Sequence, residues 1–270
     1  MPSPRLASSL RARVLTGALL LMSAPGVTGC VDHAAEHRVR ANAFLRGGDP
    51  AGALKECDLG LEAKKDNLPL LILRGKALFE LDRLDEARTA FEGSIAKGQK
   101  EEPTALAEAY LGLAMIGSRQ KDYPLARKYF EKLVAINDRD ATSHLNVART
   151  CLEMKDLPCA IEHGELAGRM RGDEEPVLFT LGTIYLAADK LKEAELTFQH
   201  ICEVAPSAAS CPYGVALVAA KAGDKPKALK ELADAVRRKL PNPDNIAADP
   251  GFASLRDDPE FRAIVASAKP

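Results

Sequence analysis

The sequence predicts an all-α protein built as a stack of helical hairpins, with a capping helix at its C-terminal end. Three observations predict this fold. A pattern recurs about every 34 residues from residue 34 onward, small residues occupy two fixed positions of every repeat, and aromatic residues make up only 5% of a chain without tryptophan. Many short contacts between alanine-rich helices suit this composition better than the large core of a β-sheet protein.

The repeat is clearest at one alanine in each unit. Successive alanines are 34 residues apart, except for one step of 39 that contains five extra residues around positions 98–103. A second small residue lies twelve residues before each alanine. The alanines are Ala53, Ala87, Ala126, Ala160, Ala194 and Ala228, and the second set is Ala41, Gly75, Ala114, Ala148, Gly182 and Ala216. The repeats are expected at 34–67, 68–106, 107–140, 141–174, 175–208 and 209–242.

These two positions predict where the helices of a hairpin cross. Two antiparallel helices approach closely only where both faces carry small side chains. Turn signals such as Gly48-Asp49-Pro50 and Asp122-Tyr123-Pro124 lie between the paired helices. Aspartate can cap the helix that follows, and proline is tolerated in its first turn.

The fifth unit shows most clearly which family the repeats resemble. It reads Leu178-x-x-Leu181-Gly182-x-x-Tyr185, then Ala194-x3-Phe198, and it ends at Pro206. At these residues the chain resembles the tetratricopeptide repeat (TPR) family, and the resemblance covers residues 34 to about 242. The resemblance implies a right-handed α-solenoid of helix-turn-helix repeats with a concave groove.

Residues 243–270 are expected to cap the last repeat. Asp258 has the character of an N-cap and Pro259 that of a first helical residue, and Phe261, Ile264 and Val265 form one apolar face. A solenoid must cover the exposed face of its final repeat, so the helix is interpreted as structural.

The N-terminus predicts export and a lipid anchor. Residues 1–29 combine three arginines, no acidic residue and a short apolar stretch at Val14–Met22 that is too short to span a bilayer. Val27-Thr28-Gly29-Cys30 then resembles a lipobox, which implies cleavage before Cys30 and acylation, including palmitate, at that cysteine. Residues 30–33 would be a lipidated linker. The alternatives are a plain signal peptide with a chance cysteine, or a cytoplasmic protein whose first helix is apolar.

The predicted location is the outer membrane of a bacterium, facing the periplasm. Val31 follows the cysteine and Asp32 comes one place later, whereas the enteric sorting rule retains lipoproteins in the inner membrane when aspartate directly follows the cysteine. The periplasmic side of the inner membrane is the alternative. Two or more acyl chains would hold the protein stably.

The resemblance also implies where a partner would bind. In this family the first helix of each hairpin lines the concave surface, and two thirds of the corresponding positions here are apolar, against 46% for the chain. An apolar peptide or amphipathic helix is therefore the expected ligand, with Lys76 and Arg149 available for carboxylates. The alternatives are that these residues pack helices together, or that a lipid-proximal segment or a second copy fills the groove. The candidate residues are Ile72, Lys76, Phe79, Leu111, Met115, Leu145, Arg149, Leu152, Phe179, Leu186, Tyr213 and Leu217.

Two cysteine pairs are candidate disulfides. Cys151 ends one helix and Cys159 begins its partner, while Cys202 and Cys211 lie at the junction of two hairpins. Both pairs suit an oxidising periplasm, and free buried thiols are the alternative. Cys57 occupies a core position.

Catalysis is not expected. The sequence contains no metal-protease, phosphate-loop or serine-hydrolase motif, so no enzyme activity, metal, cofactor or small-molecule substrate is predicted. A net charge of −1 also argues against nucleic acid as a partner.

The predicted function is that of a lipid-anchored scaffold or adaptor that supports assembly of an envelope complex. One version is a pilotin-like helper for a type IV pilus secretin, because those lipoproteins have a similar layout. The alternative is a regulatory or docking subunit for an envelope or polysaccharide-synthesis enzyme.

Overall fold

The computed structural model describes residues 32–98, 103–241 and 243–268. Within these residues the chain forms thirteen α-helices, three short 3₁₀-helices and no strand, so the all-α prediction is confirmed. His33–Pro270 form one compact unit. The predicted signal peptide at 1–29 and Cys30 lie outside the described residues.

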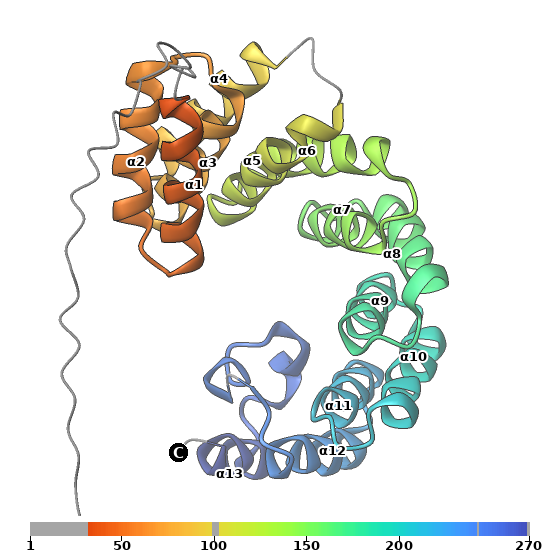
Figure 1. Cartoon of the computed structure of the whole chain (residues 1–270). Coiled ribbons are helices and arrows are strands. Elements are labelled where there is room, and N and C mark those ends of the chain that lie inside the picture. Colours follow the sequence, from red (N-terminus) through yellow and green to blue (C-terminus); the bar gives the residue numbers. More distant parts are fainter. Residues whose placement is uncertain (1–31, 99–102, 242, 269–270) are drawn as a thin grey trace, which may run out of the picture. The chain divides into compact units, whose positions relative to one another are not determined.

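Twelve of these helices pair into six consecutive hairpins (Figure 1). They are α1 (His33–Arg46) with α2 (Pro50–Ala63), α3 (Leu68–Glu80) with α4 (Leu84–Lys97), α5 (Ala107–Arg119) with α6 (Tyr123–Ile136), α7 (Ala141–Glu153) with α8 (Leu157–Arg171), α9 (Glu175–Ala187) with α10 (Leu191–Val204), and α11 (Ser210–Ala222) with α12 (Lys225–Arg237). A 3₁₀ turn, η1 (Pro103–Leu106), precedes α5. Each helix packs against the next, and the first helices of neighbouring hairpins also touch, as α1 touches α3 and α9 touches α11. The predicted right-handed α-solenoid is confirmed.

The small residues lie at the helix crossings. All twelve are buried, and the alanines among them have no exposed surface. The two glycines show why the side chain at a helix crossing must be small. A Cβ atom on Gly75 would lie 2.6 Å from the Phe91 ring, and one on Gly182 would lie 2.7 Å from the Phe198 ring. Each ring packs directly on a glycine backbone, which brings α3 against α4 and α9 against α10.

All six turns inside the hairpins use the same backbone device. One residue adopts a left-handed conformation with φ between 58° and 80°, and the next residue caps the second helix. Glycine provides this conformation only at Gly48 and Gly223, and the other turns use Asp82, Lys121, Lys155 and Asp189. In four turns the cap is an aspartate whose carboxylate accepts a backbone N–H, at Asp49, Asp122, Asp156 and Asp224. Arg83 and Lys190 provide no such side-chain bond.

The C-terminal cap forms as predicted. Asp258 accepts hydrogen bonds from the backbone of Glu260 and Phe261, and α13 (Pro259–Ser267) packs against α12. Phe261 is buried, and Ile264 and Val265 contact the same apolar core. Before α13 the chain forms η2 (Pro243–Asn245) and η3 (Pro250–Leu255), and η3 packs on α11. The last repeat is therefore covered by both η3 and α13.

Candidate functional site

One hollow brings together several of the predicted groove residues, and we call it the central cleft. It has a volume of about 630 Å³ and lies among α3, α5, α6 and α7. Four predicted groove residues contribute to it, namely Phe79, Leu111, Met115 and Arg149. Its other lining residues are Ser118, Arg119, Tyr123, Phe130, Asn146, Thr150 and Glu153.

Leu111 and Met115 form the apolar floor of the central cleft. They lie one turn apart on α5, and 40% and 42% of their surface is exposed. Phe79 lies on α3, where the Arg119 guanidinium stands 5.2 Å from the centre of its ring. Large apolar side chains left open next to one another in a hollow are typical of a binding surface.

Arg149 provides the cleft with a positive charge that lacks an acidic partner. Its Nε and Nη2 atoms donate to Thr180 Oγ1 at 3.1 and 3.0 Å, and among the described residues no carboxylate pairs with it. Desolvation lowers the pKa of Arg149, and a guanidinium nevertheless stays charged at neutral pH. The nearest acid on the same helix face, Glu153, accepts a hydrogen bond from the Tyr123 hydroxyl. Among the described residues, a partner's carboxylate would not have to displace an existing ion pair of Arg149.

Lys76 is placed differently from Arg149. Its Nζ lies 2.8 Å from Glu108 Oε1, so this cation already has a carboxylate partner within the chain. The structure therefore favours Arg149 over Lys76 as the residue that would bind a partner's carboxylate.

Several predicted groove residues belong to the core. Ile72, Leu145, Leu186 and Leu217 are each less than 10% exposed. Leu145 packs with Ala167 and Val177, and Leu152 is half-buried against the core of the third and fourth hairpins. For these positions the structure favours the alternative that they hold helices together.

The end of the groove at the sixth repeat is lined partly by the chain's own C-terminal segment. Phe179, Leu186, Tyr213 and Leu217 face a hollow of about 720 Å³ whose other wall includes residues 249–251, 253 and 254. The Tyr213 hydroxyl donates to Asp249 Oδ2 at 2.5 Å, and burial together with this carboxylate raises the pKa of Tyr213. A partner at this end would contact residues of η3 as well as α9 and α11.

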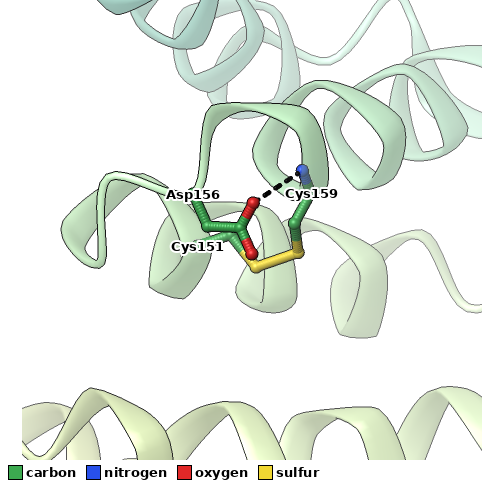
Figure 2. A group of neighbouring side chains, drawn as sticks. All are labelled: Cys151, Asp156 and Cys159. Atoms are coloured by element: carbon green, nitrogen blue, oxygen red, sulfur yellow. Dashed lines mark hydrogen bonds between the residues drawn. A yellow bond between two sulfur atoms is a disulfide. The ribbon is translucent and has the colours of Figure 1, made fainter.

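Two disulfides brace the stack. Cys151 at the end of α7 is bonded to Cys159 at the start of α8, and their Cα atoms are 5.9 Å apart (Figure 2). Cys202 of α10 is bonded to Cys211 of α11, with Cα atoms 5.4 Å apart. The first bond lies within one hairpin, whereas the second joins two hairpins. Cys57 is a buried free thiol, and burial raises its pKa to about 12.

Asp156 lies beside the first disulfide, as Figure 2 shows, and its carboxylate oxygen is within 4.8 Å of both sulfur atoms. Two sulfurs and a carboxylate are a donor set that metal ions use, but cysteine binds metals as a thiolate. Here the sulfurs are bonded to each other, while Asp156 accepts from the Cys159 N–H and from Arg127 Nη1. The group fixes the turn of the fourth hairpin.

Sequence reasoning missed part of the central cleft. The groove prediction considered only the first helix of each hairpin. It therefore missed Tyr123 and Phe130, which lie on α6, the second helix of the third hairpin. Asn146, Thr150 and Glu153 lie on α7 at positions next to the predicted ones. The helical spacing of these three around Arg149 is the signal that could have identified them.

None of the helices in the described part of the chain has the length and apolar character needed to cross a bilayer.

Comparison with known proteins supports the fold. The sequence model of the tetratricopeptide repeat family matches residues 72–144. No curated protein matches the chain in sequence. Three solved structures illustrate the likeness in fold. A tetratricopeptide repeat protein from Parabacteroides merdae is 14% identical, with a TM-score of 0.64 over 87% of this chain and 98% of its own.

The other two structures match a smaller share of this chain. MamA residues 41 to the end from Desulfovibrio magneticus RS-1 are 23% identical, with a TM-score of 0.60 over 65% of this chain and 97% of that one. YrrB, described as a TPR protein with an unusual peptide-binding site, is 18% identical, with a TM-score of 0.56 over 69% and 93%. Since the family model, the repeated hairpins and the shared fold agree, the chain contains tetratricopeptide repeats and has the fold of a tetratricopeptide repeat solenoid.

Proposed function

We propose that the chain is a non-catalytic adaptor that binds a segment of a protein partner in the central cleft. One observation carries this proposal: Leu111 and Met115 are open to solvent in the same hollow as Arg149, which has no acidic partner among the described residues. The ligand that fits is an amphipathic helix or peptide with apolar side chains toward α5 and a carboxylate toward Arg149. YrrB, a protein of similar fold, is described as having a peptide-binding site.

The size of the apolar contribution follows from the exposed fractions. Full burial of a leucine or methionine side chain contributes about 1.5–3 kcal/mol, so the exposed 40% or so of each would contribute about 1 kcal/mol. Together the two residues would account for about thirtyfold in affinity. Arg149 would add orientation through a charge-assisted hydrogen bond.

We further propose that the protein is anchored by lipid at Cys30 to the outer membrane, facing the periplasm, with the inner membrane as the alternative. Support comes from the lipobox-like sequence and from two cysteine pairs placed for disulfides, which persist in oxidising compartments. In that setting the adaptor would support assembly of an envelope complex, such as a type IV pilus secretin. The alternative is docking of an envelope or polysaccharide-synthesis enzyme.

The test is in-cell crosslinking from the central cleft. A photo-crosslinking residue at Ser118, which also lines the central cleft, should capture one discrete partner, and adding L111E/M115E to that chain should reduce capture at least about thirtyfold. L196E is the matched control, because Leu196 is 57% exposed on α10 and does not line the central cleft. Equal capture by the cleft variant and the control would contradict the proposal. A secretin partner would favour the pilotin-like role, and a glycan-synthesis enzyme would favour the docking role.

The lipid anchor needs a separate test. Labelled palmitate should enter the wild-type chain and be absent from C30A, which should also leave the membrane fraction. Incorporation that survives in C30A would contradict the anchor while leaving the cleft proposal untouched.

A further inference from the structure

Two histidines meet inside the fourth hairpin. His144 of α7 is only 4% exposed, and His163 of α8 is half-buried beside it. Their Nδ1 atoms are 3.0 Å apart, and their ring centres are 5.0 Å apart. The second ring nitrogen of His144, Nε2, lies 3.0 Å from the backbone oxygen of Asp138. A direct imidazole–imidazole hydrogen bond therefore joins the two helices.

The contacts determine which nitrogen carries the proton. A carbonyl oxygen can only accept, so His144 Nε2 must donate to Asp138. In a neutral imidazole the other nitrogen is then an acceptor, so His163 must donate from its own Nδ1 to His144 Nδ1. His163 Nε2 is left with a lone pair that accepts no bond from the described residues.

The pair can hold one added proton but not two. The first can bind at His163 Nε2 and leaves the Nδ1–H···Nδ1 bond in place. The second would have to bind at His144 Nδ1, where it would face the Nδ1–H of His163. Two donors and two positive charges cannot share a 3.0 Å contact in a buried site, so a second proton requires the rings to separate.

The charged groups around the pair do not neutralise two positive charges. Burial, the neighbouring His144 and Arg127 of α6 lower the pKa of His163. Glu162 of α8 and Glu131 of α6 raise it, and the net shift is downward. Arg127 is itself paired with Glu131 and Asp156. Other titratable groups on the packed elements include Asp138 and Asp140 before α7, Arg171 and Glu165 of α8, and Glu175 and Tyr185 of α9. Asp140 caps α7 through Ser143, Glu165 accepts from Tyr185, and Glu175 accepts from Ser210.

The two ends of this hairpin are fastened differently. The Cys151–Cys159 disulfide closes the end at the turn, and the histidine pair lies toward the opposite, open end. We propose that the histidine pair, His144 and His163, is an acid-sensitive contact that holds α7 against α8 while the pair carries at most one proton and releases the open end when a second is added. The disulfide confines the opening to that end.

The direction of the pH effect follows from the proton count. The opened hairpin can bind a second proton that the closed one cannot, so acid favours opening and closure weakens as the pH falls through the usual range of imidazole titration, about pH 6.5. Each proton that only the opened form can bind shifts the opening equilibrium by about tenfold between pH 7.5 and pH 5.5.

Hydrogen exchange and imidazole NMR on the whole chain test the proposal, with EDTA present so that no metal ion bridges the rings. Protection factors in α7 and α8 should fall at least about tenfold from pH 7.5 to pH 5.5 relative to those in α3 and α4. The NMR spectra should show both rings of the pair protonated together only when the open-end amides lose protection. Independent titration of both rings near pH 6.5, or equal protection changes in both hairpins, would overturn the proposal.

Two matched variants separate this effect from general acid sensitivity. H163N places an amide near the Nδ1 position, and this amide can donate to a neutral His144 or turn over to accept from a protonated one. Its α7 and α8 protection should therefore not fall with acid. H200N is the control. Glu203 and Asp173 raise the pKa of His200, so its protonated form stabilises the fold, and its loss should increase the destabilisation of the protein by acid. If H163N lost protection as the wild type does, the histidine pair would not be the acid-sensitive group.

Partner binding provides a further readout that rests on the proposed function. Arg149, Asn146 and Thr150 line the central cleft from α7, so release of this helix should weaken capture at pH 5.5 in the wild type and not in H163N. Failure of crosslinking at every pH would contradict the proposed binding of a partner in the central cleft, but not the histidine proposal. The exchange and NMR results would still decide the histidine proposal.

Discussion

Replacing Gly182 with alanine tests whether the stack depends on contact between a ring and a glycine backbone. The new Cβ would lie 2.7 Å from Phe198 Cε1, well inside the 3.4 Å of an ordinary contact. The ring is fully buried, and a Cβ on Gly214 of α11 would lie 2.2 Å from it, so the backbone of the next hairpin leaves the ring little room to move. Overpacking costs about 1–3 kcal/mol, and the better helix propensity of alanine returns about 0.5–1 kcal/mol. We expect a net loss of about 0.5–2 kcal/mol.

Urea unfolding followed by circular dichroism, with the disulfides intact, measures this loss. G93A is the matched control, because a Cβ on Gly93 of α4 meets nothing within 4 Å, and it should stabilise by about 0.5–1 kcal/mol. The double variant G182A/F198L should lose less free energy of unfolding than the two single variants together, since leucine leaves room for the methyl group of Ala at position 182. If G182A and G93A changed the free energy of unfolding in the same direction, the explanation of the repeat by close helix approach would be wrong.

Three further predictions concern the turns and the disulfides. D224A should lower the free energy of unfolding by about 1 kcal/mol, because it removes a side-chain cap of α12. K190A is the control, since Lys190 makes no capping bond to α10, and equal losses of the two variants in urea unfolding would contradict this prediction. K155G should raise stability by about 0.5–1 kcal/mol by relieving a left-handed lysine, whereas glycine in place of the helical Lys128 should lower it, as thermal melts would show. Reduction of the two disulfides, which close loops of 8 and 9 residues, should remove about 2.5 kcal/mol each, and an unchanged melting temperature in reductant would refute a stabilising role.

The hairpins and their crossings could be predicted because each rests on local sterics that recur in the sequence. Ala148 and Ala160 lie twelve residues apart in the fourth repeat, as their counterparts do in every other repeat, and both are fully buried. The same register places His144 against His163, yet this pair was not predicted. A histidine contact depends on one hairpin's side chains and has no counterpart in the other repeats that would reveal it.

The groove residues could be predicted only in part, because one stripe of a helix contributes both to a surface and to a core. Leu111 and Leu145 occupy the same position of successive repeats, but Leu111 is 40% exposed and Leu145 is 7% exposed. The difference arises because Leu145 packs on Ala167 and Val177, two contacts that a repeat alignment does not contain. The left-handed lysines at 121 and 155 were equally hidden, since lysine carries no signal for that conformation.

The two ends of the solenoid differ in how firmly they are held. A repeat protein is coupled mainly between neighbours, and the Cys202–Cys211 bond, η3 and α13 strengthen that coupling around the sixth hairpin. Beyond α1, in the described residues, no helix covers the first hairpin, and Val39 is 64% exposed. A force applied at the N-terminal end would therefore peel hairpins away one after another, while the C-terminal repeats kept their structure longest.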